Sequence, residues 1–265
     1  MKDIRIAIIG CGNLGQAILK GLIDDHTYPS ENITATKRHT EVLEPFKSEG
    51  IVVTSNNKAA VESSDLIIVA LKPHDILKTL EELGPSLNPG NHKLVSLATG
   101  ISMDQIEKAI GKQLPIFRAM PNTGADVKES LTCLCSQYAS LEDEQLVDYF
   151  FNRIGTTITI DEDLMEAATV LGACGIAFVM RFMRAMVQGG IQIGFSAKTA
   201  NEIVNQTVMG ASQLLIERKE HPEFEIDKVT TPKGCTIAGL NEMEHYGFSS
   251  ALIRGIVTSY EKIEK

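Results

Sequence analysis

The chain has 265 residues, 43% of them hydrophobic and 22% charged, which is the composition of a globular protein with one large domain or two moderate ones. Its formal net charge of −9 comes without a long basic block, which argues against nucleic acid as the main partner. Five cysteines without a regular framework and six histidines without ligand spacing lead us to expect reduced thiols in a cytoplasmic protein and no metal site.

The first half of the chain alternates short β-type runs with helical patterns. We expect strands at 4–10, 32–36, 51–54, 65–71, 93–99 and 114–120, and helices at 13–25, 39–49, 57–63, 74–83 and 102–111. Two further strands around a helix at 141–152 are expected within 127–160, with Cys133 and Cys135 buried on one strand face. Hydrophobicity begins at Ile4 without the features of a secretory signal. The alternation predicts an α/β domain with a doubly wound parallel sheet over residues 1–160.

A glycine turn, "IIGCGNLGQAI" (8–18), follows the first expected strand and opens the first expected helix. Its G-x-G-x-x-G glycines are Gly10, Gly12 and Gly15, and in this context the motif predicts a Rossmann dinucleotide site. The first glycine permits the tight turn, the second lets backbone approach the pyrophosphate, and the third allows close helix–strand packing. Amides at the helix N-terminus then face the phosphates.

The end of the second strand, "TATKRHT" (34–40), indicates which dinucleotide is bound. An NAD site usually has an acidic residue there, whereas this chain has Thr36, Lys37 and Arg38. A hydroxyl and two cations suit the 2′-phosphate of NADP, so we expect NADP(H), with NAD(H) as the alternative. The alternative is that Lys37 and Arg38 are two solvated surface residues with no role in binding.

Three more stretches end strands at the sheet edge where a dinucleotide would lie: 70–73, 97–100 and 120–124. Lys72 and Asn122 are the polar groups there, although either could be a satisfied loop residue.

The second half, from about residue 161, is mostly helical. We expect helices over 162–193, over 196–219 with Ser196 as N-cap, and at about 237–246 and 250–263, with Gly247 ending the third in a left-handed cap. The uncharged run at 167–180 is too short to cross a bilayer and reads as a buried helix. Because the long helix is apolar nearly all round, we expect residues 161–265 to dimerise; packing against the chain's own first domain is the alternative.

These motifs together resemble the pyrroline-5-carboxylate reductase family over essentially the whole chain. The most specific stretches are "NNKAAVESSDLIIVALKPH" (56–74), "MPNT" (120–123), "DEDLMEAAT" (161–169), "QTVMGASQLL" (206–215) and "VTTPKGCTIAGLNEMEHYG" (229–247). The resemblance implies a Rossmann domain followed by a helical domain that interlocks with a partner subunit. It also implies the last step of proline biosynthesis, the NADPH-dependent reduction of 1-pyrroline-5-carboxylate to L-proline.

The resemblance places further residues at the sites. It implies cofactor contacts by Asn57, by 70–73 and by 97–99, and a substrate site lined by Glu162, Gly234, Cys235 and Thr236. The candidate cofactor residues are therefore Ile9, Gly10, Cys11, Gly12, Asn13, Leu14, Gly15, Thr36, Lys37, Arg38, Asn57, Ala70, Leu71, Lys72, Pro73, Leu97, Ala98, Thr99 and Asn122.

The chain departs from the family pattern in three places. Where the family usually reads L-S-G-S-G-P-A-Y, residues 171–178 read "LGACGIAF". Lys233 and Cys235 stand in a segment that the family writes P-G-G-T-T or P-G-G-A-T, and Gly124 replaces a usual proline. These changes leave the expected fold unaltered, but they bear on catalytic efficiency and on which substrate the protein would reduce.

The expected mechanism is hydride addition to the C=N carbon of a protonated imine, which demands no strong general acid. Amides of Gly234, Cys235 and Thr236 at a helix start would hold the substrate carboxylate, and the Thr236 hydroxyl would contact the ring nitrogen. The plain alternative is that Thr236 caps the helix. Lys233 either attracts the anion or points to solvent.

Two other functions stay open. One is a related NADP-dependent reductase of another cyclic imine or of a keto or hydroxy acid. In a β-hydroxyacid type of reductase Lys198 would be the nearest candidate for the catalytic lysine, but it lacks the expected glycine-rich lead-in. The other is a non-catalytic NADPH-binding dimer. For assembly we expect a homodimer, with a higher assembly of dimers as the extension.

Overall fold

The computed structural model describes residues 4–24 and 28–263. They form two compact units: residues up to Cys174 together with Ile263, and Gly175–Lys262. The sequence predicts a domain boundary at 160–161, whereas the compact units divide after residue 174. Residues 161–174 therefore belong to the first unit, although their helical sequence pattern resembles that of the second.

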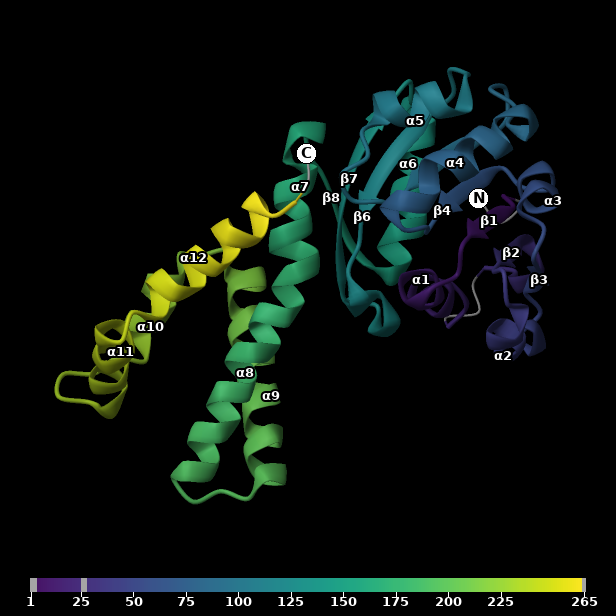
Figure 1. Ribbon diagram of the computed structural model, residues 1–265. Coiled ribbons are helices and arrows are strands. Elements are labelled where there is room, and N and C mark those ends of the chain that lie inside the picture. The colour runs from purple at the N-terminus through teal and green to yellow at the C-terminus, as the bar shows by residue number, and fades with distance from the viewer. Residues whose placement is uncertain (1–3, 25–27, 264–265) are drawn as a thin grey trace. The chain divides into compact units, whose positions relative to one another are not determined.

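The first unit is built on one sheet with the strand order β3-β2-β1-β4-β5-β6-β7-β8 (Figure 1). The strands are β1 (Ile6–Ile9), β2 (Ile33–Thr36), β3 (Val52–Thr54), β4 (Leu66–Val69), β5 (Lys93–Ser96), β6 (Ile116–Met120), β7 (Ser130–Gln137) and β8 (Gly155–Thr159). The predicted strands are confirmed. All neighbours pair in parallel except β6 and β7, which are antiparallel. The short 121–129 connection allows that reversal, because a parallel pair needs a longer crossover.

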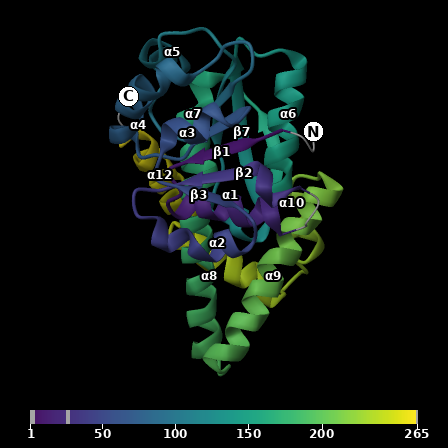
Figure 2. The same ribbon diagram turned by 90° about the vertical axis from the view of Figure 1, so that its right-hand side faces the viewer.

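Helices cover both faces of this sheet (Figures 1 and 2). One face carries α1 (Asn13–Ile23), α2 (Glu44–Ser48) and α6 (Leu141–Phe151); the other carries α3 (Asn57–Glu62), α4 (Pro73–Leu83) and α5 (Met103–Ile110). Strand β1 serves both faces, because Ile6 and Ile8 enter one core while Ala7 and Ile9 enter the other. A strand buried on both sides reads as a continuous apolar run, which is why the sequence located it.

The segment after β8 packs on the second of these cores. It contains α7 (Met165–Ala168) and a π-helical stretch, Thr169–Cys174. Met165 is fully buried in the same core as Cys133 and Cys135. This contact explains why the first unit extends past residue 160, and it confirms that the two cysteines are buried.

The second unit is entirely helical within the described residues. Its helices are α8 (Gly175–Gln192), α9 (Ala197–Arg218), α10 (Pro222–Lys228), α11 (Cys235–His245) and α12 (Phe248–Glu261). Ser196 caps α9 by accepting a hydrogen bond from the Thr199 amide (3.1 Å), and Gly247 is left-handed at φ +77°, as predicted. The sequence missed α10. Helices α8 and α9 lie side by side around a small core of Val187, Ala200 and Val204.

One helical stretch, Glu162–Gln192, is long and apolar enough to span a membrane by length and composition. It has 31 residues and a mean hydropathy of 1.7 in its most apolar window, of which 11% is buried. The uncharged run at 167–180 is itself too short for a bilayer, but the helical stretch that contains it extends to Gln192. The expectation that it is buried is wrong for most of its length in this single chain.

His92 provides a pH-dependent contribution to stability at the start of β5. Its side chain is 4% exposed, and its Nδ1 accepts a hydrogen bond from the Asn88 amide (3.0 Å). Burial lowers the pKa of His92 below its ordinary 6.5, and Lys93, Lys112 and Arg5 lower it further while Asp65 opposes them. The folded state therefore binds the proton less readily than the unfolded state. Stability is retained above about pH 6.5 and lost as pH falls through the lower, folded-state pKa.

We expect the urea midpoint of the wild type to fall between pH 7.5 and pH 5.5, and His92→Gln to lose less over the same interval. Glutamine keeps an acceptor and removes the titration. Parallel pH curves for the two proteins would contradict this assignment.

Candidate functional site

The glycine turn has the conformation that a dinucleotide site requires. Gly10 has φ +86°, and its amide lies 3.2 Å from the Thr36 carbonyl oxygen and 3.1 Å from the Thr36 hydroxyl. Gly12 is the N-cap of α1 and an added Cβ there would meet nothing within 4 Å. A Cβ on Gly15 would lie 3.3 Å from the Gly10 carbonyl oxygen and 3.4 Å from Ala70 Cβ. The three glycines thus supply the turn, the open approach and the close packing that the motif predicts.

Cys11 in the glycine turn and Thr36 at the end of β2 both have structural roles that the sequence did not reveal. Cys11 is fully buried, its amide donates to the Thr36 carbonyl (2.8 Å), and burial raises the pKa of its thiol to about 12. Its side chain is therefore an inert part of the core. The Thr36 side chain is also fully buried and braces the turn through the Gly10 amide. Direct contact of either side chain with the cofactor stays a prediction.

The two cations after β2 are accessible. Lys37 is half-buried and Arg38 is exposed, and neither forms an ion pair with any residue that the structure describes. Their charges are therefore available to a phosphate, and no carboxylate neutralises them at this strand end.

The sheet brings the other predicted cofactor residues to the same edge. Neighbouring parallel strands β1, β4, β5 and β6 end at the glycine turn, at 70–73, at 97–99 and at Asn122. The Ala70 amide donates to the Ile9 carbonyl (2.8 Å), and the Leu97 amide to the Val69 carbonyl (3.1 Å). Asn57 follows β3 at the same end and opens α3. The carboxyl edge of an open α/β sheet is where such folds bind ligands.

Asn122 is largely occupied by protein contacts. It is buried; its Oδ1 accepts from the Gly124 amide (2.8 Å), and its Nδ2 donates to the Gly172 carbonyl (3.2 Å). It therefore connects the end of β6 to the π-helical stretch. A direct hydrogen bond to the cofactor remains a prediction for the second Nδ2 hydrogen.

Glu162 forms an ion pair that the sequence did not reveal. Its Oε1 accepts from Arg118 Nη1 (3.1 Å) and from the Met103 amide (2.7 Å). Glu166 accepts from the other guanidinium nitrogen, Arg118 Nη2 (2.8 Å). A charged residue inside the apolar run "PIFRAM", and two glutamates four residues apart, were the available signals. A role for Glu162 toward substrate stays a prediction.

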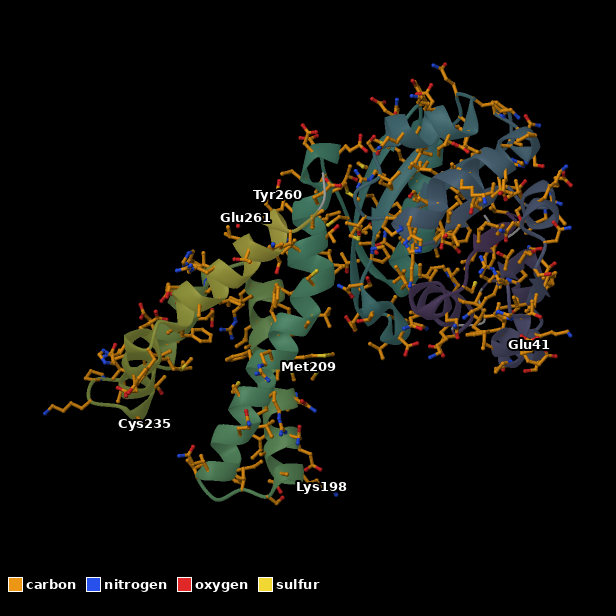
Figure 3. All side chains as sticks on the ribbon, viewed as in Figure 1. Glu41, Lys198, Met209, Cys235, Tyr260 and Glu261 are labelled. Carbon is orange, nitrogen blue, oxygen red and sulfur yellow. The ribbon has the colours of Figure 1, made fainter. Side chains whose placement is uncertain are left out.

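The predicted substrate residues of the second unit lie at the start of α11, where Figure 3 labels Cys235. Gly234 is the N-cap and its amide donates to the Thr231 carbonyl (2.9 Å), so this amide is not free to hold the substrate carboxylate and that prediction is wrong. The amides of Cys235 and Thr236 have no hydrogen-bond acceptor among the described residues. Thr236 is the second helical residue, so the alternative that it is a plain N-cap is wrong as well. Two exposed donors and a hydroxyl remain at this helix start.

Comparison with known proteins places these observations in a family. Residues 162–265 match the family model described as pyrroline-5-carboxylate reductase dimerisation, and residues 5–100 match the model described as NADP oxidoreductase coenzyme F420-dependent. A pyrroline-5-carboxylate reductase 2 of Dictyostelium discoideum is 39% identical over 98% of this chain and 92% of its own length. The chain belongs to the pyrroline-5-carboxylate reductase family.

Two further relatives of the pyrroline-5-carboxylate reductase family agree with this assignment. A pyrroline-5-carboxylate reductase 1 of Dictyostelium discoideum is 44% identical over 99% of the chain, which spans 50% of that relative's length. The solved structure of a pyrroline-5-carboxylate reductase from Coxiella burnetii has a TM-score of 0.90 at 29% identity and covers 98% of this chain and 97% of its own.

Lys233 marks a departure from the usual pattern of pyrroline-5-carboxylate reductases, and it is strained. Its φ is +61°, a left-handed conformation that costs an L-residue about 1–2 kcal/mol and costs glycine little. We expect Lys233→Gly to raise the free energy of unfolding by about 0.5–1 kcal/mol, because glycine's greater unfolded-state entropy offsets part of the relief. Urea unfolding at one fixed protein concentration measures it. Lys233→Ala keeps the strain, so an equal gain in that variant would contradict this account.

Proposed function

We propose that the protein reduces 1-pyrroline-5-carboxylate to L-proline with NADPH. The observation that carries the proposal is the edge of the first sheet. There a left-handed Gly10 and an open Gly12 lie near two cations that have no ion-pair partner among residues 4–24 and 28–263. Family membership supplies the substrate. The test is NADPH oxidation at 340 nm with pyrroline-5-carboxylate, followed by proline detection. Tight NADPH binding without turnover would leave a non-catalytic binding protein, and turnover with only another imine or a keto acid would change the substrate.

The residues present fit an NADP(H) molecule. First-turn amides of α1, starting at Asn13, would hold the pyrophosphate, and the Lys37 and Arg38 side chains would hold the 2′-phosphate. The strand ends at 70–73 and 97–99 would line the nicotinamide half. When bound, the reduced nicotinamide supplies the hydride.

The helix start of α11 supplies the substrate contacts in this proposal. The Cys235 and Thr236 amides and the partial positive charge of the helix N-terminus suit the substrate carboxylate. The Thr236 hydroxyl accepts from the protonated ring nitrogen, which orients the C=N carbon and stabilises the iminium. Because the iminium is already electrophilic, no side chain has to donate a proton before hydride arrives.

We expect Thr236→Ala to lower kcat/KM at least about tenfold, the equivalent of one lost hydrogen bond of roughly 1.4 kcal/mol. Thr236→Ser is the matched control, since it keeps the hydroxyl at an exposed position. Steady-state kinetics at saturating NADPH measure both variants. Wild-type kinetics in Thr236→Ala would remove this hydroxyl from the mechanism.

The second unit supports a homodimer. Its core is small, whereas Met180, Ile193, Met209, Ile216 and Ile253 are each more than half exposed in the single chain. Exposed apolar faces of this extent mark an interface, and the family model over 162–265 describes dimerisation.

Light scattering should give at least twice the chain mass at micromolar concentration, and a monomer would contradict the proposal. A higher assembly of dimers and a cytoplasmic location extend it; the second rests on the cysteine argument from sequence.

A further inference from the structure

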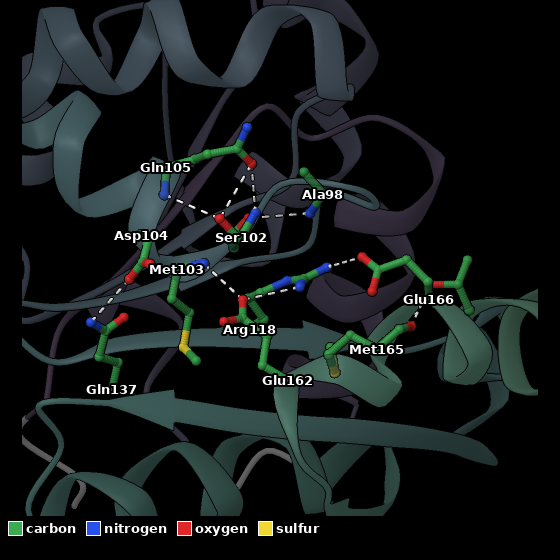
Figure 4. Close-up of polar contacts among 12 residues, drawn as sticks. Ala98, Ser102, Met103, Asp104, Gln105, Arg118, Gln137, Glu162, Met165 and Glu166 are labelled. Atoms are coloured by element: carbon green, nitrogen blue, oxygen red, sulfur yellow. Dashed lines mark hydrogen bonds and ion pairs between the residues drawn. The ribbon is translucent and has the colours of Figure 1, made fainter. Parts of the chain in front are cut away.

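Arg118 is a buried cation on strand β6 of the first unit, the unit whose sheet edge holds the predicted cofactor residues. Its side chain is 3% exposed, while those of its partners Glu162 and Glu166 are 28% and 19% exposed. Figure 4 shows the guanidinium between the two carboxylates. One nitrogen serves each carboxylate, at 3.1 Å and 2.8 Å, while Nε is buried without a hydrogen-bond partner among the described residues. A planar fork that bridges two anions fixes their separation and orientation.

The cluster joins three segments that are distant in sequence. Arg118 belongs to β6, two residues before the strand ends and four before Asn122. Both glutamates lie on the helical segment after β8, one turn apart. Through Glu162 Oε1 the cluster also holds the Met103 amide, the first residue of α5, at 2.7 Å. Only the N-cap residue Ser102 separates this amide from the loop at 97–101, which follows β5.

A second bond fixes the same helical segment farther along. The Nδ2 of Asn122 donates to the Gly172 carbonyl in the π-helical stretch (3.2 Å). The end of β6 therefore holds this segment at two points, and the first of these points also holds the start of α5. The loop at 97–101 has Ser102 in a capping box at its far end and β5 at its near end. Its position depends on both anchors.

We propose that Arg118 is a positioning residue for hydride transfer: by holding Glu162 on the Met103 amide, it keeps in place the loop at 97–101, which would line the nicotinamide half of a bound cofactor. The proposal rests on the proposed function. Without the guanidinium, two partly buried carboxylates face each other, and their repulsion draws Glu162 away from the amide. The amides that would hold the cofactor phosphates lie at the glycine turn, on another loop, so we expect cofactor affinity to depend little on Arg118.

A role in stability alone makes a different prediction. If the cluster only holds the fold together, its loss lowers the thermal midpoint and the amount of active protein, and leaves the catalytic constant per folded site unchanged. If it positions the loop, hydride transfer slows in protein that is folded and saturated with NADPH.

The experiment compares Arg118→Lys and Glu166→Gln with a control, Lys93→Met. Lysine keeps the charge but offers a point contact in place of the fork. Glutamine at 166 keeps the size and an acceptor but removes the charge that anchors Arg118 Nη2, so the guanidinium no longer holds Glu162 in a fixed orientation. Lys93 forms a partly buried ion pair with Asp143 (3.6 Å) at the opposite end of β5, so its loss tests a comparable pair away from the loop.

We expect both cluster variants to lower kcat at least tenfold while the NADPH dissociation constant changes less than threefold. The deuterium isotope effect from 4-deuterated NADPH should rise, because hydride transfer becomes rate-limiting. Lys93→Met should change neither. Hydrogen–deuterium exchange of the 97–103 amides should be faster in the cluster variants than in the control.

Unchanged kcat and isotope effect in folded Glu166→Gln would overturn the inference, even if Arg118→Lys fails to fold. Unchanged exchange at 97–103 would overturn it independently of any turnover. If wild-type protein does not reduce pyrroline-5-carboxylate, the proposed function fails, and the exchange measurement still decides whether Arg118 holds the loop.

Discussion

Gly10→Ala is expected to weaken NADPH binding by about two orders of magnitude. An alanine at φ +86° carries a left-handed penalty of about 1–2 kcal/mol, and its Cβ would lie 2.3 Å from Leu71 Cδ2 and 3.3 Å from the Ala70 carbonyl oxygen. Relieving the clash moves the Gly10 amide from Thr36, which forfeits about 1 kcal/mol of hydrogen bonding. We expect the free variant to relax to another turn conformation, so that binding NADPH must restore the native one; the costs, together roughly 3 kcal/mol, then appear as about 100-fold weaker binding.

The control for this prediction is Gly111→Ala. Gly111 is also left-handed, at φ +66°, but it ends α5 and an added Cβ would meet nothing within 4 Å. Both variants should lose stability by a similar strain, and only Gly10→Ala should lose NADPH affinity, as measured by fluorescence titration. Equal NADPH dissociation constants for Gly10→Ala and wild type would show that the turn does not form the cofactor site.

The sequence predicted the sheet well because buried strands are made of apolar residues, which stand out in the sequence. Strands β1 and β4 are covered on both faces, so they appear as continuous apolar runs whatever surrounds them in sequence. The glycine turn was equally accessible, because its mechanism needs a fixed spacing of glycines after a strand. Both the strands and the glycine turn are determined by residues that are neighbours in sequence, so local sequence patterns predict them.

Helix α10 was missed because burial does not define it. Its seven residues, "PEFEIDK", have no buried member and no apolar stripe. It is held by charge, since Glu225 accepts hydrogen bonds from Arg218 Nη1 (2.8 Å) and from Lys228 Nζ (2.6 Å). These two pairs lower the pKa of the Glu225 carboxyl. A short segment rich in charged residues is also typical of loops, so the sequence does not distinguish this helix from a loop.

The candidate site was predicted where it is contiguous in sequence and missed where it depends on long-range pairing. Arg118 lies 44 residues from Glu162 and 48 from Glu166, and only the folded chain shows that they meet. The same applies to Asn122, whose side chain was predicted to contact the cofactor and is bonded to Gly172. At α11 the error was in the predicted first residue of the helix. The helix begins at Cys235, two residues before the predicted start, and this moves Thr236 inside the first turn.

Removing both cations after β2 is expected to abolish the preference for NADPH over NADH. Lys37 and Arg38 have no ion-pair partner within the described chain, so their charges are not already neutralised. A charge-assisted hydrogen bond contributes about 1.5 kcal/mol, so each side chain accounts for about tenfold in NADPH affinity. The double variant Lys37→Ala/Arg38→Ala should therefore bind NADPH about 100-fold more weakly. NADH has no 2′-phosphate, so its dissociation constant should change less than about threefold.

Ionic strength separates this explanation from a general disturbance of the strand end. In the wild type the preference for NADPH should shrink as salt rises from 0.05 M to 0.5 M, because exposed charges are screened beyond a few ångströms at high salt. In the double variant the ratio of the two dissociation constants should not respond to salt. Lys47→Ala is the matched control, since Lys47 is an exposed base on α2 already paired with Glu44 (3.3 Å). A similar loss of NADPH affinity in Lys47→Ala would mean that overall charge, rather than these two side chains, selects the cofactor.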